Sequence, residues 1–340
     1  MRLVGAWRGP VEPHSIPAKE IASMKSSRIF ACFSVAALLS GATYAQTIGI
    51  VTTPAGSFSN SAGAAVAKVL VDKAKLRVVV QPQASTGFEE VETLAAHFNM
   101  SNSFDATFYA TGTGEYQAMG PHENLRQVAT LIPYRVAMHV RADSPIKSIA
   151  DLKGKRVSSG FRAQKTIARI IEAHLGTAGL TYKDVIPVPT PNVVRQADDF
   201  KAGKVDTLFF ALGSAAVKEA SASVGGLRVL EVDDSPQVMQ RAQKILPGSY
   251  LLNIKPHPSI EGIKRPTNVI AFDMVMVTNA KVADDVIYKA AKAIYENKKD
   301  LVATFRPFLI FNPKNIAKQV KDVPMHPGAV KFYREAGLMK

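Results

Sequence analysis

Cysteine and tryptophan are almost absent from this 340-residue chain. It contains one of each, Cys32 and Trp7. Both lie in the first 45 residues, so the rest of the chain has no disulfide, no thiol nucleophile and no cysteine-ligated metal. A chain of this length can instead be stabilised by the burial of apolar surface in one or two domains.

Catalytic and metal-binding patterns are also missing. The seven histidines form no His-x3-His pair, and no serine lies in a G-x-S-x-G motif. The stretch TGTGE (111–115) lacks the lysine and the Ser/Thr end of a phosphate-binding loop. We therefore predict that the protein is not an enzyme and has no catalytic residue, no metal ligand and no cofactor.

Basic residues exceed acidic ones, with 42 Lys and Arg against 28 Asp and Glu and a formal net charge of +14. This excess favours acidic partners. The lysines are scattered, however, and no basic tract is interleaved with aromatic residues. The pattern therefore argues against nucleic acid as a partner.

The best candidate for a membrane segment is a short apolar run near the start of the chain, too short to span a bilayer. It lies in MKSSRIFACFSVAALLSGATYA (24–45), where Lys25 and Arg28 precede it and small residues follow. That layout is typical of a secretory signal peptide cleaved near Ala45. We therefore predict a periplasmic protein in which residues 1–23 are an upstream extension.

Strands and helices alternate along the remaining chain. Apolar runs, loops of small residues and amphipathic stretches follow one another, which predicts an α/β fold with mostly parallel sheets flanked by helices. In the first series we expect strands at 47–52, 76–82 and 103–114, and helices at 61–74 and 88–98.

Two long apolar runs, at 129–142 and 268–278, interrupt this alternation. A second strand and helix series lies between them. The simplest interpretation is two α/β lobes joined by two crossings, with the ligand in the cleft between the lobes. Lobe 1 would comprise 46–138 plus 251–340, and lobe 2 would comprise 139–250.

The stretch SSGFRAQKTIARIIEA (158–173) predicts the start of a helix in lobe 2. Ile167, Ile170 and Ile171 repeat at the spacing of one buried helical face, so the helix is expected to begin near Arg162. A helix N-terminus carries unpaired N–H groups and a partial positive charge, which suit an anion. An ordinary capped helix with solvent-exposed basic residues is the alternative.

Several longer stretches resemble one family of transport proteins. VRADSPIKSIADLKGKRVSSG (140–160), DFKAGKVDTLFFALGSA (199–215) and VPMHPGAVKFYREAGL (323–338) are similar to the substrate-binding subunits of TAXI-type TRAP transporters. The resemblance covers essentially all of 46–340. It implies the two-lobed fold of periplasmic binding proteins, of a type II-like form.

Members of this family capture a small organic solute outside the cytoplasmic membrane and deliver it to membrane subunits powered by an ion gradient. The resemblance implies that the cleft of this chain closes on a small anionic solute, a carboxylate or an amino acid. We expect a monomer, with hinges near 135–141 and 250–275. Two alternatives remain open: an exported α/β enzyme on the same scaffold, and a binding protein that feeds a membrane sensor.

The resemblance also implies ligand-binding positions in the loops that face the cleft. Where the family's first loop ends in two tyrosines, this chain has serine and asparagine, so small polar groups replace two phenols. Arg162 and Lys165 are additional to the family's small-residue loop and favour a firmly held carboxylate. The complete set is Ser57, Ser59, Asn60, Thr86, Tyr109, Thr111, Ser159, Gly160, Arg162, Lys165 and Phe210.

Overall fold

The computed structural model describes residues 47–340. The extension predicted at 1–23 and the signal peptide predicted at 24–45 lie outside the described residues. Within 47–340, no helix combines the length and the apolar character needed to cross a lipid bilayer.

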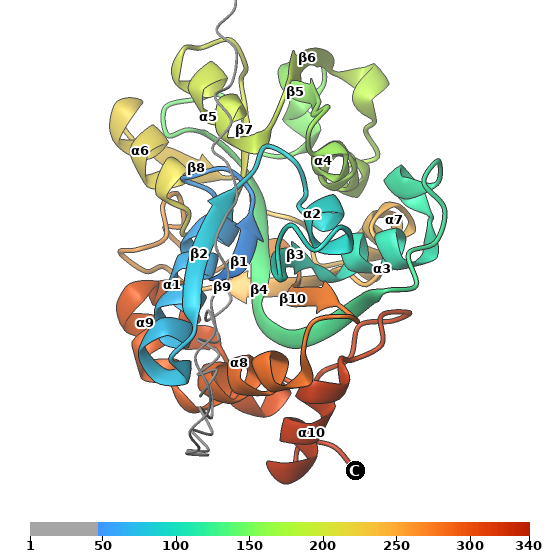
Figure 1. Cartoon of the computed structure of the whole chain (residues 1–340). Helices are drawn as coiled ribbons and strands as arrows, with labels where there is room; N and C mark the ends of the chain where they lie inside the picture. Colours follow the sequence, from blue (N-terminus) through green and yellow to red (C-terminus); the bar gives the residue numbers. More distant parts are fainter. Residues whose placement is uncertain (1–46) are drawn as a thin grey trace, which may run out of the picture. The chain divides into compact units, whose positions relative to one another are not determined.

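A mixed β-sheet forms the centre of the fold (Figure 1). Its main path has the order β2-β1-β3-β10-β4-β7, with β8 paired to β4 and β9 to β10, while β5 and β6 form a separate two-stranded sheet. The strands are β1 (Thr47–Thr52), β2 (Arg77–Pro82), β3 (Phe98–Asn102), β4 (Leu125–Arg141), β5 (Arg156–Gly160), β6 (Ile186–Thr190), β7 (Leu208–Ala211), β8 (Leu227–Val229), β9 (Tyr250–Ile254) and β10 (Thr267–Asn279).

The helices pack against the sheets and against each other in small groups. Helix α1 packs with α8 and α9, α4 with α7, α5 with α6, and α10 with α8. They are α1 (Phe58–Ala74), α2 (Phe88–Glu92), α3 (Ser103–Thr111), α4 (Lys165–Thr177), α5 (Val193–Lys201), α6 (Ala215–Ser223), α7 (Pro236–Ile245), α8 (Asp284–Glu296), α9 (Lys298–Thr304) and α10 (Pro327–Glu335). The 3-10 helices η1 (Gly114–Tyr116) and η4 (Arg306–Ile310) also matter below.

Strands β4 and β10 coincide with the two predicted crossings and lie side by side, antiparallel to each other. Strand β3 pairs with the C-terminal part of β10, whereas β7 and β8 pair with the C-terminal part of β4. The two long strands therefore connect a half that carries β1 to β3 with a half that carries β7 and β8. This arrangement supports the two-lobe division and its hinges, which remain predictions.

The sheet is mixed rather than mostly parallel. Parallel pairing is confined to β1 with β2, β1 with β3, and β5 with β6. Every pairing of the long strands with another strand is antiparallel, and Gln127 of β4 forms one isolated parallel bridge with Met325. The physical reason is that β4 carries the chain out of the first half and β10 carries it back, so these neighbours run in opposite directions.

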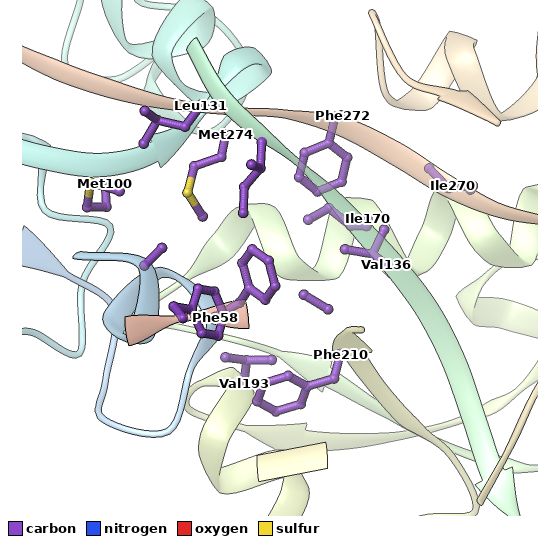
Figure 2. Close-up of a cluster of buried hydrophobic side chains, with 14 of the residues drawn as sticks. Phe58, Met100, Leu131, Val136, Ile170, Val193, Phe210, Ile270, Phe272 and Met274 are labelled. Carbon is purple, nitrogen blue, oxygen red and sulfur yellow. The ribbon is translucent and has the colours of Figure 1, made fainter. Parts of the chain in front are cut away.

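The two long strands form the centre of the hydrophobic core. Along β10, residues 269–272 and 274–277 are buried, and all of them are apolar. A continuous apolar run of this kind is expected where both faces of a sheet are covered. Figure 2 shows side chains from the sheet, α1, α4 and α5 gathered in one cluster, among them Phe58, Val136, Ile170 and Phe272.

Three local predictions were wrong. The segment predicted as a strand at 103–114 is helix α3, because the Asn102 side chain accepts a hydrogen bond from the Asp105 N–H (2.8 Å) and caps a helix. The helix expected at 88–98 ends at Glu92, and the chain then enters β3. Helix α4 begins at Lys165 rather than near Arg162, because Phe161 adopts a positive φ of 36° just before it.

Candidate functional site

A cavity of about 90 Å³ lies where β3, β4, β7 and β10 meet the N-termini of four helices. Its wall is largely apolar and aromatic, and Figure 2 shows several of these side chains. The apolar lining residues are Phe58, Met100, Tyr134, Val136, Ile167, Ile170, Val193, Phe209, Phe210, Ala211 and Phe272. The polar ones are Thr53, Ser57, Ser59, Thr86, Ser101, Asn102, Asp105, Gln164 and Thr166.

Three hydroxyl groups gather where the loop after β1 enters α1. Thr53 Oγ1 donates to Ser57 Oγ at 2.8 Å and is also hydrogen-bonded to Ser59 Oγ. Ser57 caps α1 by accepting from the N–H of Asn60 at 3.2 Å. This end of the cavity therefore presents hydroxyl groups beside the positive end of a long helix.

Asp105 is the one carboxyl group among the described residues that line the cavity. Its Oδ2 accepts from Asn102 Nδ2 at 2.8 Å and from Thr166 Oγ1 at 3.0 Å, whereas its Oδ1 has no partner within residues 47–340. The side chain is 3% exposed, and this burial raises the pKa of Asp105 to about 7. The cavity thus holds a carboxyl group that titrates near neutral pH and has one free oxygen.

Four helix N-termini point their first turns at this cavity. Ser57, Asn102 and Gln164 are the N-cap residues of α1, α3 and α4, and Val193 is the first residue of α5. Gln164 Oε1 accepts from the N–H of Val193 at 3.0 Å and joins two of these ends. No Lys, Arg or His of 47–340 lines the cavity, so the groups of its lining that can attract an anion are the helix N-termini rather than basic side chains.

Two contacts join α4 to the region of α3. The first is the hydrogen bond between Thr166 and Asp105. The second is an ion pair in which Arg169 Nε lies 2.6 Å from Glu115 Oε1 in η1, while the guanidinium lies 5.2 Å from the centre of the Phe108 ring. These contacts connect segments assigned to different predicted lobes, and the residues of the first contact line the cavity.

The structure brings four of the predicted site residues together at the cavity: Ser57, Ser59, Thr86 and Phe210. Ser57 and Ser59 are buried at the start of α1, and Phe210 on β7 is 2% exposed. Thr86 Oγ1 accepts from the hydroxyl of Tyr116 at 3.1 Å. The first loop and the end of β7 therefore both contribute to the cavity lining, and a role of these residues in ligand binding stays a prediction.

Three further predicted residues of the first half lie outside the cavity lining. Asn60 donates to Thr52 Oγ1 at 3.0 Å, and Thr111 donates to the carbonyl of Thr107 at 2.7 Å. Tyr109 is buried between Phe88 and His122 in a separate core cluster. Because 103–111 is a helix rather than a strand, Tyr109 and Thr111 turn away from the cavity.

The predicted residues of the loop before α4 also lie outside the cavity lining. Ser159 and Gly160 pair with β6 within the small sheet, and Arg162 and Lys165 are exposed. The same stretch contributes Gln164 and Thr166 instead, each 2% exposed. The polar groups that reach the cavity from this loop are therefore neutral.

Sequence reasoning missed Asp105, Gln164, Thr166 and Thr53. A signal existed for the first of these, because Asn102 followed by Asp105 is the spacing of a helix N-cap and its first turn. No comparable signal marked Gln164 and Thr166, since their burial depends on the positive φ of Phe161.

Comparison with solved structures identifies the class of fold. The chain is similar to a periplasmic transporter protein (TM-score 0.55, 14% identity, 87% of this chain and 94% of the other) and to Rpa4515 of R. palustris, solved with adipate (TM-score 0.53, 12%, 86% and 94%). It also matches the periplasmic aliphatic sulphonate binding protein SsuA of Escherichia coli (TM-score 0.46, 16%, 86% and 88%). The two matches with TM-scores above 0.5 confirm the predicted α/β fold of periplasmic binding proteins.

A family model of the NMT1-like family matches residues 50–337. The chain therefore belongs to the NMT1-like family, and the match spans nearly the whole described part.

Proposed function

We propose that this protein is an extracytoplasmic solute-binding protein that captures a small amino acid in the described cavity and delivers it to membrane transport subunits. The observation that carries the proposal is that one cavity is lined both by the hydroxyl groups at the α1 N-terminus and by Asp105, whose Oδ1 has no partner within residues 47–340. The periplasmic binding protein fold supports the same class of function.

Two groups of lining residues suit the two charges of an amino acid. At the α1 end, hydroxyl groups of Thr53, Ser57 and Ser59 and the helix dipole favour a carboxylate. Elsewhere in the lining, Asp105 Oδ1 has no partner within residues 47–340 and can accept a hydrogen bond from an ammonium group. A simple carboxylate leaves this oxygen unpaired, so an amino acid fits better than a carboxylate without an amine.

The aromatic wall suits an apolar side chain on the solute. Phe58, Phe209, Phe210 and Phe272 come from α1, β7 and β10 and surround the cavity together. Its 90 Å³ is smaller than the cavity of about 150 Å³ that holds benzene in an engineered protein. Entry of an amino acid therefore requires the surrounding segments to move apart and close again.

Two contacts between the predicted lobes support a mechanism of cleft closure. The Thr166 to Asp105 hydrogen bond and the Arg169 to Glu115 ion pair join the two predicted lobes when they are closed. A solute that bridges α1 and Asp105 on one side and Thr166 on the other favours this state, since it binds the closed form better than the open one.

The sequence resemblance to TAXI-type TRAP subunits supports an ion-gradient transporter as the membrane partner. Uptake of labelled solute by cells that carry the protein and its membrane subunits tests this point. We expect uptake to stop when an ionophore collapses the ion gradient and to continue when ATP is depleted at an intact gradient. The reverse result would assign the protein to an ATP-driven system.

Asp105 gives one observation in favour of the enzyme alternative, because a buried carboxyl with a pKa near 7 is also typical of a general acid or base. Incubation of each binding solute with the protein, followed by mass spectrometry, separates the two functions. We expect the solute to be recovered unchanged.

The binding proposal is tested by calorimetry with matched pairs of solutes. Each of alanine, valine, leucine and glutamate is compared with the acid that lacks its amino group. We expect the amino acid to bind more tightly in at least one pair and its affinity to rise between pH 6 and pH 8, as Asp105 ionises. Equal binding within every pair, or no binding at all, would refute the proposed solute class.

A further inference from the structure

A second pocket, of about 450 Å³, lies on the opposite face of β4 from the candidate cavity. Successive side chains of a strand point to opposite faces, and here Tyr134 and Val136 line the cavity while Pro133 and Arg135 line the second pocket. Its other walls come from β9, the loop that follows β9, and η4.

Arg135 places a buried positive charge in this pocket. Its side chain is 8% exposed, and its guanidinium forms no ion pair within residues 47–340, where its Nε also has no hydrogen-bond partner. Burial lowers the pKa of Arg135 below its ordinary value, but an arginine stays protonated in proteins. A buried charge without a counter-ion costs free energy, which a bound anion would recover.

The rest of the pocket is basic and apolar. Lys255 and Arg306 are exposed at its rim, neither forms an ion pair within the described chain, and no Asp or Glu of that part lines the pocket. Leu309 and Ile310 of η4 add apolar surface, with 50% and 44% of each exposed. Cations around an apolar wall match a ligand with an oxyanion head and an aliphatic body.

We propose that this pocket is a second binding site, specific for a small organic anion, in which the Arg135 guanidinium holds the oxyanion and η4 packs against the aliphatic part. A planar guanidinium suits a carboxylate because it can donate two parallel hydrogen bonds. The site is separate from the amino-acid cavity, but an aliphatic acid could occupy either, so the matched-pair calorimetry described above is repeated in Arg135→Gln to report on the cavity alone.

Calorimetry with hexanoate, acetate and hexanol tests the proposal. We expect wild-type protein to bind hexanoate more tightly than acetate or hexanol, because only hexanoate has both the charge and the chain. Arg135→Gln should weaken hexanoate binding by about tenfold or more, whereas Arg77→Gln, the same change at an exposed position outside the pocket, should not.

Arg135→Gln removes an unpaired buried charge, so we expect the variant to fold. If it does not fold, Arg306→Gln serves as the test variant instead, and it should weaken hexanoate binding about threefold. Hexanoate should also raise the thermal unfolding temperature of wild type more than that of Arg135→Gln. Equal hexanoate affinity in wild type and the Arg135 variant, or no binding to wild type, would overturn the second site.

Discussion

Replacing Asp105 by asparagine should stabilise the protein at pH 8 and leave its stability almost unchanged at pH 4. The pKa of Asp105 rises from an ordinary value of 3.8 to about 7 in the folded protein because the carboxyl is buried. The folded state therefore binds more protons than the unfolded state between these two values, so stability falls as the pH rises through this window. Above pH 7 the carboxyl group is ionised, and the free-energy cost of burying its charge approaches its full value.

The size of the effect follows from the two pKa values. At about 1.4 kcal/mol per pH unit, the difference between 3.8 and 7 corresponds to about 4 kcal/mol as an upper limit. Asparagine has the same shape, and its oxygen can still accept from Asn102 and Thr166. We therefore expect Asp105→Asn to gain about 1–4 kcal/mol at pH 8, with the gain shrinking steadily below pH 7.

Urea unfolding of both proteins from pH 4 to pH 8 measures this difference. Asp234→Asn is the matched control, because Asp234 is exposed and lies outside the cavity lining. Its effect on stability should be small at every pH. A stability gain for Asp105→Asn that does not vary with pH, or a loss of stability at pH 8, would refute a buried carboxyl with a pKa near 7.

Four other substitutions test separate parts of the structure. Arg169→Ala removes the ion pair that joins α4 to η1 and should weaken solute binding about fivefold in calorimetry; unchanged affinity would exclude a role in closure. Gly87→Ala should lower the free energy of unfolding by about 2 kcal/mol or more, because φ is +82° and a Cβ would lie 2.3 Å from Val51 Cγ1. Gly154→Ala, also at positive φ but in open space, should cost only about 1 kcal/mol, and equal losses would contradict the steric argument. Arg162→Ala should leave solute affinity unchanged because Arg162 is exposed and outside the lining; a tenfold loss would contradict that placement.

The parts of the fold that could be predicted from sequence are those with strong periodicity. The stripe of Ile167, Ile170 and Ile171 correctly indicated α4. The two long apolar runs, interpreted as crossings between lobes, are the strands β4 and β10, and their role as crossings stays a prediction. The segment at 103–111 was misassigned because its aromatic residues favour a strand locally, whereas the Asn102 cap and packing of Phe104 and Tyr109 make it a helix.

The cavity could be predicted only in part, because its residues come from segments far apart in the chain. Ser57 and Ser59 could be predicted from the sequence of the first loop alone. The partnership of Asp105 with Thr166 joins residues 61 positions apart and depends on how α3 and α4 pack. Gln164, rather than the predicted Arg162, lines the cavity. This placement follows the positive φ of Phe161, and no sequence pattern predicts that backbone conformation.

The most direct test of the central claim combines one change in the protein with one in the solute. Calorimetry at pH 8 measures wild type and Asp105→Asn, each with an amino acid that binds and with the acid that lacks its amino group. If the ammonium pairs with Asp105, the amino acid should lose about tenfold in affinity in the variant while the acid loses none. Equal losses for both solutes, or no loss for either, would contradict the account.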